Sequence, residues 1–288
     1  MKKYFSLVLF AHSIFALPFA MIGFFLGVAN SPQPFNWTLF ILVLLCMVFA
    51  RNSAMAFNRY LDRNIDAKNP RTKSRDIPAG KISANEALIF VMINCVLFII
   101  ATAFINKLCF YLSPVALFVV LFYSYTKRFT ALCHLILGLG LALAPIGAYI
   151  AVTGSFSLVP VLYSFAVLFW VSGFDIIYAL QDEEFDRKEQ LHSIPAAIGI
   201  KNALSLSVVL HICSALCVIL PIFFTTFSYP YYAGVIFFCA MLVYQHLLVK
   251  PGDISKVDRA FATTNGFASV IFAICFLLDV FLRTNFNF

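Results

Sequence analysis

Charged side chains are scarce in this chain. They make up 11% of its 288 residues, whereas ordinary globular domains carry about 25%. Apolar residues account for 62% and aromatic residues for 17%. This composition excludes a soluble domain. Because long apolar runs in lipid satisfy their backbone polar groups within helices, we expect an all-α, polytopic membrane protein.

The sequence also lacks paired-cysteine motifs and a separate polar domain. None of the eight cysteines forms a C-x-x-C motif, and all lie within apolar segments, so we expect packing residues rather than zinc ligands or disulfides. The net charge of +7 is not the mark of a nucleic-acid-binding protein, because membrane topology and anionic lipid headgroups account for it. The expected partner is the lipid bilayer, with no nucleic acid.

Nine apolar stretches are long enough to cross a bilayer, which takes about 20 helical residues. They cover residues 4–28, 37–57, 84–105, 108–125, 129–152, 156–180, 203–224, 231–249 and 260–282. We therefore predict nine transmembrane helices in one bundle spanning residues 1–288. A four-helix unit could be duplicated within it, over about residues 1–125 and 126–249, with the ninth helix following.

Basic residues fall on one side of this topology. Of the twenty Lys and Arg residues, only Lys107 and Arg283 lie opposite the amino terminus. The acidic residues share the amino-terminal side except for Asp279. By the positive-inside rule, the side rich in Lys and Arg is the cytoplasm. We therefore expect the amino terminus and all acidic loops to be cytoplasmic, and any polar site to open there.

The first acidic motif closes the second apolar stretch. Asn58, Asp62 and Asp66 are spaced by four residues, so each step of about 400° returns them to nearly the same helical face. A solvated helix end explains any single aspartate. A carboxylate near hydrocarbon costs on the order of 3 kcal/mol, however, so an aligned row indicates a bound cation or an aqueous cavity.

The second acidic motif closes the sixth stretch. Asp175, Tyr178, Asp182 and Asp186 follow one another at steps of three, four and four residues, and therefore share a helical face. Asp175 lies well inside the apolar stretch. Both motifs precede an Ile-Pro-Ala sequence, at residues 77–79 and 194–196. This repeated sequence favours the duplicated four-helix unit. It predicts that two acidic helix ends face each other across a bundle.

Basic side chains border both motifs. The longest polar loop, residues 67–83, contains Arg71 and Arg75, and a short turn after the fourth stretch contains Lys127 and Arg128. Anchoring of the topology explains part of this charge. Arg also binds phosphate through paired hydrogen bonds, and Lys binds it as a point charge. We take these four residues as candidate diphosphate ligands.

The first apolar stretch contains His12 and Pro18. A proline at that depth predicts a kinked helix. A lone histidine in a membrane helix is a functional candidate because polar groups there are costly, although a packing role explains it equally well. His134, within the fifth stretch, is assigned no role.

On these residues the chain resembles the UbiA superfamily of intramembrane prenyltransferases. The family motifs N-x-x-x-D-x-x-x-D and D-x-x-Y-x-x-x-D are matched by residues 58–66 and 175–182. The stretches 71–80 and 125–128 are similar to the family's loops, and the likeness covers essentially the whole chain. The resemblance implies a nine-helix fold with two Asp-rich motifs on cytoplasmic loops.

The resemblance also implies a reaction. A polyprenyl group would pass from polyprenyl diphosphate to the ring of an aromatic acid, for ubiquinone or menaquinone biosynthesis, in the bacterial inner membrane. Mg²⁺ is the implied cofactor, since it prefers one or two carboxylates together with phosphate oxygens. Asp175 is expected to orient or deprotonate the acceptor hydroxyl, and Tyr178 to face the allylic cation. The candidates for holding the metal and diphosphate are Asn58, Asp62, Asp66, Asp182 and Asp186.

Two aromatic acids remain candidates for the acceptor. Family enzymes that act on 4-hydroxybenzoate have an Arg early in helix one for the acceptor carboxylate, and this chain has no Arg before Arg51. His12 and its neighbours look more like branches that prenylate a dihydroxynaphthoate. Acceptor binding is therefore predicted near His12 and Asp175.

Two other classes compete with this interpretation. CDP-alcohol phosphotransferases also use membrane carboxylates, but they need a D-G-x-x-A-R sequence that does not occur here. A transporter would explain the internal repeat. Transporters usually carry broken helices with polar residues near the membrane midplane, whereas the acids here gather at one face.

Overall fold

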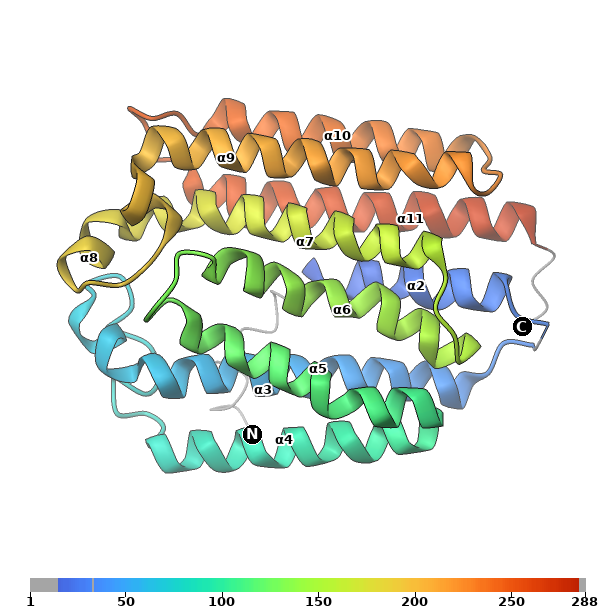
Figure 1. The fold of residues 1–288 in the computed structure, drawn as a ribbon, viewed down its shortest axis with the longest axis horizontal. Helices are drawn as coiled ribbons and strands as arrows, with labels where there is room; N and C mark the ends of the chain where they lie inside the picture. Colours follow the sequence, from blue (N-terminus) through green and yellow to red (C-terminus); the bar gives the residue numbers. More distant parts are fainter. Residues whose placement is uncertain (1–14, 33, 285–288) are drawn as a thin grey trace.

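The structure, a computed structural model, describes residues 15–32 and 34–284. The described residues form a bundle of long helices that run side by side (Figure 1). The helices are α2 (Leu17–Ala29), α3 (Trp37–Lys68), α4 (Ala84–Ile105), α5 (Lys107–Thr126), α6 (Cys133–Thr153), α7 (Leu158–Ala179), α8 (Glu183–Lys188), α9 (Ile194–Ile219), α10 (Tyr229–Leu248) and α11 (Asn265–Arg283). Short turns named η2 (Leu180–Asp182), η3 (Leu220–Phe223) and η4 (Arg259–Thr264) join some of them.

Each of the nine predicted stretches overlaps an apolar helix in the described part of the chain. Within the described part of the chain, eight helical segments are long and apolar enough to cross a bilayer, and α2 is a shorter apolar helix. In Figure 1, α9 and α10 lie at one edge of the bundle and α4 at the other, with α2, α6, α7 and α11 between them. The loop after α3 and the short helix α8 lie together at one end (Figure 1).

Several helix boundaries differ from those predicted. α3 continues eleven residues past 57 to Lys68, so the first acidic motif lies on the helix itself. α9 begins at Ile194 rather than at 203, and Gly199 interrupts it with φ 77°. Pro18 stands in the first turn of α2, where a missing N–H costs no helical hydrogen bond. The residues before Phe15 that would form the other arm of the predicted kink lie outside the described range, as does His12, so the kink at Pro18 stays a prediction.

The polar loop after α3 is closed by a capping box. The Ser83 hydroxyl accepts a hydrogen bond from the Glu86 N–H, and the Glu86 carboxylate accepts one from the Ser83 N–H. Such reciprocal caps satisfy donors that a helix start leaves free. The chain is thereby fixed at both ends of the loop, by α3 before it and by the start of α4 after it.

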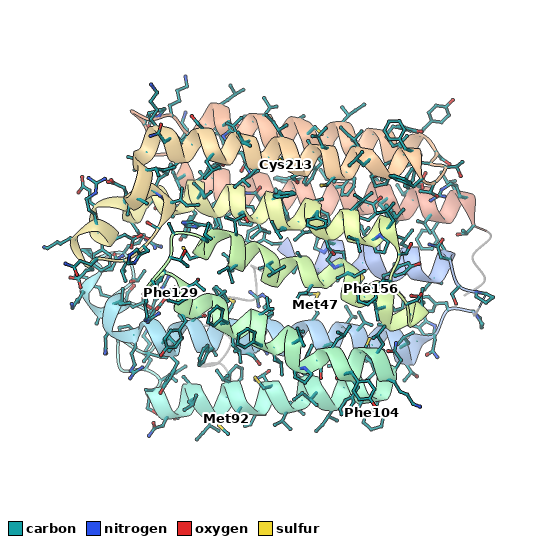
Figure 2. The ribbon with its side chains drawn as sticks, in the orientation of Figure 1. Met47, Met92, Phe104, Phe129, Phe156 and Cys213 are labelled. Atoms are coloured by element: carbon teal, nitrogen blue, oxygen red, sulfur yellow. The ribbon has the colours of Figure 1, made fainter. Side chains whose placement is uncertain are left out.

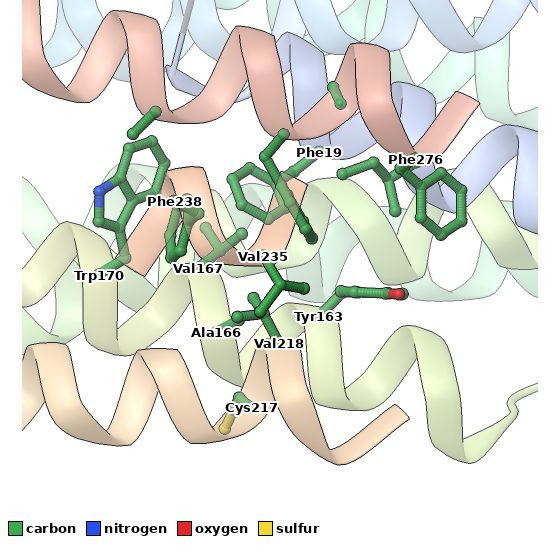
Figure 3. Packing of buried hydrophobic residues seen from close by; sticks show 14 of the residues in the cluster. Phe19, Tyr163, Ala166, Val167, Trp170, Cys217, Val218, Val235, Phe238 and Phe276 are labelled. Atoms are coloured by element: carbon green, nitrogen blue, oxygen red, sulfur yellow. The ribbon is translucent and has the colours of Figure 1, made fainter. Parts of the chain in front are cut away.

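Small residues let the central helices approach closely. A Cβ at Gly23 of α2 would overlap the Pro145 carbonyl of α6, and one at Gly138 of α6 would overlap the Leu168 carbonyl of α7. In lipid, helices associate through such close packing, because there is no hydrophobic force between them. Around this contact, large rings such as Phe19, Trp170 and Phe238 interlock (Figure 3).

The outer surface is apolar where lipid would cover it. Met92 and Phe104 of α4 point away from the bundle in Figure 2, and are 61% and 74% exposed. Large exposed apolar areas on a folded protein mark an interaction with lipid or another apolar partner. Together with the long apolar helices, this surface shows a multi-pass membrane protein.

Candidate active site

A polar cavity of about 260 Å³ is lined by residues of α3, α5, α6 and α7 and of the loop that follows α3. Residues of both acidic motifs line it. Its polar and charged lining residues are Asn58, Asp62, Asp66, Asn69, Arg71, Thr72, Arg75, Tyr123, Ser124, Lys127, His134, Asp175, Tyr178, Asp182, Asp186 and Ser193. The two motifs, more than a hundred positions apart in sequence, therefore face one another as predicted.

Asp62 is the most enclosed carboxylate of the first motif, with 1% of the residue exposed. Lys127 Nζ lies 2.5 Å from its Oδ2, and Arg128 Nη2 lies 2.9 Å from its Oδ1. The Asn58 amide donates to the same carboxylate at 3.2 Å. Arg128 also donates to the Leu61 carbonyl, which fixes its guanidinium against α3. The basic turn after α5 thus compensates a buried charge, as buried charges require.

Asp66, one helical turn further on, has its own cation. Arg75 Nη1 donates to both carboxylate oxygens, at 2.8 and 3.0 Å. The Thr72 hydroxyl donates to the Asp66 backbone carbonyl at 3.2 Å. The polar loop therefore folds back onto the helix end that precedes it, and brings Arg75 into the cavity.

Asp182 of the second motif is held by the same loop. The Asn69 amide donates to its Oδ1 at 2.9 Å, and Arg71 binds both of its oxygens in a paired ion bridge. Arg71 Nη1 also donates to the Tyr178 hydroxyl at 2.9 Å. Burial opposes the charge of the Arg71 guanidinium, but the bonds to Asp182 outweigh it and raise the pKa of Arg71 above its ordinary value.

Asp175 lies one to two turns deeper and contacts a buried histidine. His134 Nδ1 lies 2.6 Å from Asp175 Oδ2. The other ring nitrogen of His134, Nε2, accepts a hydrogen bond from the Ile194 N–H at 3.3 Å. A backbone N–H can only donate, so this contact favours the tautomer with the proton on Nδ1, from which His134 donates to Asp175.

An apolar cavity of about 500 Å³ adjoins the polar one. Tyr123, Leu137 and Asp175 line both cavities, so the two meet at Asp175. From there the apolar cavity extends along α6 toward Phe156, beyond the far end of that helix, and Met47 lines it from α3 (Figure 2). An elongated apolar molecule with a charged head fits this pair of cavities.

Arg51 lines the apolar cavity from α3. It stands seven residues before Asn58, which is about two helical turns, or about 10 Å, deeper in the bundle. An ionisable residue at membrane depth usually marks a functional site. Arg51 and His134 are two ionisable site residues whose roles the sequence did not predict.

Most predicted site residues are brought together. Those of the two motifs, with Arg71, Arg75 and Lys127, line the polar cavity, and Arg128 joins them through Asp62. His12 lies outside the described residues. Among the residues described, no three His, Cys, Asp or Glu side chains stand close enough to hold a metal ion by themselves. Oxygen donors on two facing helix ends nevertheless suit Mg²⁺, which takes one or two carboxylates and completes its shell with phosphate and water oxygens.

A charged cavity joined to a long apolar one inside a membrane bundle suits a substrate with a charged head and an apolar tail. The sequence profile of the UbiA prenyltransferase family matches residues 16–273. The chain belongs to this family and is a prenyltransferase. The family membership favours the enzyme over the transporter.

Individual relatives agree with the family match. A "4-hydroxybenzoate octaprenyltransferase" of Nitrosomonas europaea is 30% identical over 277 residues, covering 92% of this chain and 89% of that protein. The apo structure of a UbiA homolog from Aeropyrum pernix K1 has 30% identity and a TM-score of 0.83, and the alignment covers 93% of this chain and 98% of that one. A UbiA homolog from Archaeoglobus fulgidus, solved bound to GPP and Mg²⁺, has the same fold, with 20% identity and a TM-score of 0.78 over 96% of this chain and 99% of that one.

Proposed function

We propose that this protein transfers a polyprenyl group from polyprenyl diphosphate to the ring of 4-hydroxybenzoate, in the pathway to ubiquinone. One observation carries the proposal: the polar and apolar cavities meet at Asp175, with Arg51 on the apolar side. A diphosphate and a polyprenyl tail match the two cavities, and a small aromatic acid matches the junction. The name of the Nitrosomonas europaea relative supports the choice of ring.

The donor head would bind among the basic side chains. Arg71, Arg75, Lys127 and Arg128 each pair with an aspartate at present, and each can turn from it to a phosphate oxygen. Mg²⁺ bound to the diphosphate through the acidic motifs would neutralise charge on the leaving group. The residues suited to hold it are Asn58, Asp62, Asp66, Asp182 and Asp186.

The reaction replaces one bond with another. The bond between the first prenyl carbon and the diphosphate oxygen breaks, and its electron pair leaves with pyrophosphate. The allylic cation that remains is attacked by an electron pair of the acceptor ring, and the ring then loses a proton. In our proposal, Asp175 binds the acceptor hydroxyl or takes its proton, and Tyr178 lies near the developing charge.

Arg51 supports an acceptor that carries a carboxylate. It is the cation that lines the apolar cavity among the described residues, and it shares that cavity with Asp175 and Tyr123. A planar guanidinium matches a carboxylate with paired hydrogen bonds. An acid bound this way would hold its hydroxyl toward Asp175. Recognition near His12 stays a prediction, because that residue is outside the described range.

The proposed setting is the inner membrane of a bacterium, with the polar cavity on the cytoplasmic side. The distribution of Lys and Arg along the sequence supports this orientation. The alternative acceptor, a dihydroxynaphthoate for menaquinone, carries a carboxylate as well, so Arg51 does not separate the two rings.

An acceptor panel tests the proposal. Membranes containing the protein are given one polyprenyl diphosphate and Mg²⁺, with 4-hydroxybenzoate, a dihydroxynaphthoate or phenol as acceptor. We expect prenylated 4-hydroxybenzoate in clear excess over the other two products. Preferred turnover of the dihydroxynaphthoate would move the protein to the menaquinone pathway, and equal turnover of all three rings would contradict selective recognition.

A further inference from the structure

Three aromatic rings gather where the apolar cavity reaches Asp175. Phe15, Phe174 and Phe261 lie with their ring centroids 5.3 to 5.4 Å apart in each pair. All three line the apolar cavity, as does Asp175. They come from the residues just before α2, from α7 and from η4, so three separate segments converge on one spot. We refer to Phe15, Phe174 and Phe261 as the aromatic trio.

Phe261 is presented by an unusual piece of backbone. It lies in η4, a π-helical turn over Arg259–Thr264 immediately before α11. Such turns are rare, and they occur often at functional sites because they redirect a side chain within a helix. Here the turn directs Phe261 toward the second acidic motif on α7.

A buried amide holds this turn in place. Asn265 is fully buried, and its Nδ2 donates to the carbonyls of Ala260 and Phe261, at 3.0 and 2.9 Å. Its Oδ1 accepts a hydrogen bond from Trp170 Nε1 at 2.8 Å. Trp170 in turn packs on Phe174 with ring centroids 5.1 Å apart, and it lies within the core shown in Figure 3. One amide therefore links the π-turn to two aromatic residues of α7.

Phe261 stands between the two cavities. Its ring stacks on Tyr178, with centroids 4.1 Å apart and planes 28° from parallel. Tyr178 lines the polar cavity, whereas Phe261 lines the apolar one. The donor's reacting carbon joins a phosphate on the polar side to a tail on the apolar side, so it must lie at this boundary. Phe261 is then the ring that meets this carbon from the side of the tail.

We propose that Phe261 is a catalytic residue whose ring face stabilises the allylic cation and shields it from water. The inference deepens the proposed function and rests on it. When the carbon–oxygen bond breaks, its electron pair leaves with pyrophosphate, and the positive charge is spread over the prenyl carbons. An aromatic face attracts a nearby cation, most strongly where water is absent. The cation is consumed by the acceptor ring, or by water if the shield fails.

Asn265 is a positioning residue in this scheme. It touches no cavity among those described, and it acts by holding the carbonyls of the turn that carries Phe261. Its replacement would leave two carbonyls and one indole N–H without their side-chain partner. The expected consequence is a displaced Phe261 ring.

A fluorination series tests the role of the Phe261 ring. Mono-, di- and trifluorinated phenylalanine at position 261 keep the ring in place and progressively weaken the attraction of its face for a cation. Pyrophosphate release and the ratio of prenylated ring to free polyprenol are measured for each variant. We expect both to fall stepwise, reaching about 30-fold at Phe261→Leu, which is about 2 kcal/mol at 1.36 kcal/mol per tenfold. The matched control is the same series at Phe267, which is 57% exposed on α11.

Each of the other outcomes would overturn either the inference about Phe261 or the proposed function. A flat fluorine series overturns the inference, whether or not Phe261→Leu is impaired, because packing alone would then explain the ring. Wild-type protein that releases pyrophosphate but prenylates no acid refutes the acceptor assignment alone, since the series is still read from pyrophosphate release. Wild-type protein that releases none refutes both.

A double-mutant cycle tests Asn265. Asn265→Ala should lower the ratio of prenylated ring to polyprenol as Phe261→Leu does. In the Phe261→Leu background it should have little further effect, because residues that act through one another are not additive. Full additivity of the two changes would contradict a positioning role.

Discussion

His134 donates a hydrogen bond to Asp175 across 2.6 Å, from a ring whose second nitrogen is occupied by the Ile194 N–H. This arrangement fixes both the tautomer and the orientation of the imidazole. It holds the Asp175 carboxylate at the junction of the two cavities through one of its oxygens, Oδ2. A histidine in an apolar helix thereby directs an aspartate of another helix.

The first prediction concerns this pair. His134→Phe keeps a ring but removes the donor, so Asp175 should lose its fixed orientation. We expect transfer to the acceptor to fall on the order of 100-fold, within the usual range for a positioned acid or base, while pyrophosphate release without acceptor changes little. His192→Phe, at an exposed position, is the matched control. An equal loss of both activities would point to misfolding instead.

Removal of a carboxylate from either acidic motif should abolish turnover. Asp62→Asn leaves Lys127 and Arg128 without their anion, and Asp182→Asn does the same to Arg71. In both variants we expect prenyl transfer to drop by at least about 100-fold, the order of a lost charge-stabilising contact. Prenyl transfer is measured in membranes with protein levels checked by blotting. Asp253→Asn, on an exposed loop, should behave as wild type.

We expect Arg51 to make the enzyme prefer acceptors that carry a carboxylate. Arg51→Gln removes a charged hydrogen bond worth about 1.5 to 3 kcal/mol, which corresponds to roughly a 10- to 100-fold rise in KM for 4-hydroxybenzoate. Steady-state kinetics with phenol, which has no carboxylate, provide the control within the same variant. A similar rise in KM for phenol would mean that Arg51 does not bind the carboxylate.

The space in the apolar cavity should determine which lengths of polyprenyl diphosphate the enzyme uses. A Cβ at Gly147 would meet nothing within 4 Å, and this residue lines the cavity from α6. Gly147→Leu should therefore fill part of the cavity without distorting the helices. Long polyprenyl diphosphates should lose activity severalfold more than geranyl diphosphate in competition assays. Gly252→Leu, in an exposed loop with similar open space, should leave this preference unchanged.

Close helix contacts predict a stability difference between two glycines. Gly23→Ala forces a methyl group against the Pro145 carbonyl, and overpacking of this kind costs about 1 to 3 kcal/mol. Gly147→Ala places the same methyl group in open space. Thermal unfolding in detergent should therefore begin at a lower temperature for Gly23→Ala, and the reverse order would contradict the close contact between α2 and α6 at Gly23.

Much of this architecture follows from the sequence alone. Apolar run lengths predicted the helices, and steps of four residues predicted that Asn58, Asp62 and Asp66 share a face. The start of α9 was missed because Lys201 and Asn202 lower the local hydropathy without breaking the helix. Hydropathy locates the part of a helix that lies in lipid, not the full helix.

Residues such as Arg51 and His134 were harder to assign. Each is a single polar side chain in an apolar stretch, and its role depends on a partner or cavity formed by other helices. Arg51 does fall seven residues before Asn58, on the same stripe, and this spacing was a usable signal. The π-turn that presents Phe261 has no comparable signal, because tertiary packing rather than local sequence creates it.

The polar and apolar cavities meet at the Asp175 carboxylate, and this arrangement also affects how the two products leave the enzyme. In the proposed reaction, pyrophosphate would be left among Arg71, Arg75 and Lys127, whereas the prenylated ring would keep its tail in the apolar cavity on the other side of Asp175. The two products thus occupy separate compartments and need not leave in a fixed order. Soluble pyrophosphate analogues and lipophilic product mimics should accordingly be able to occupy the enzyme together, and inhibit it independently.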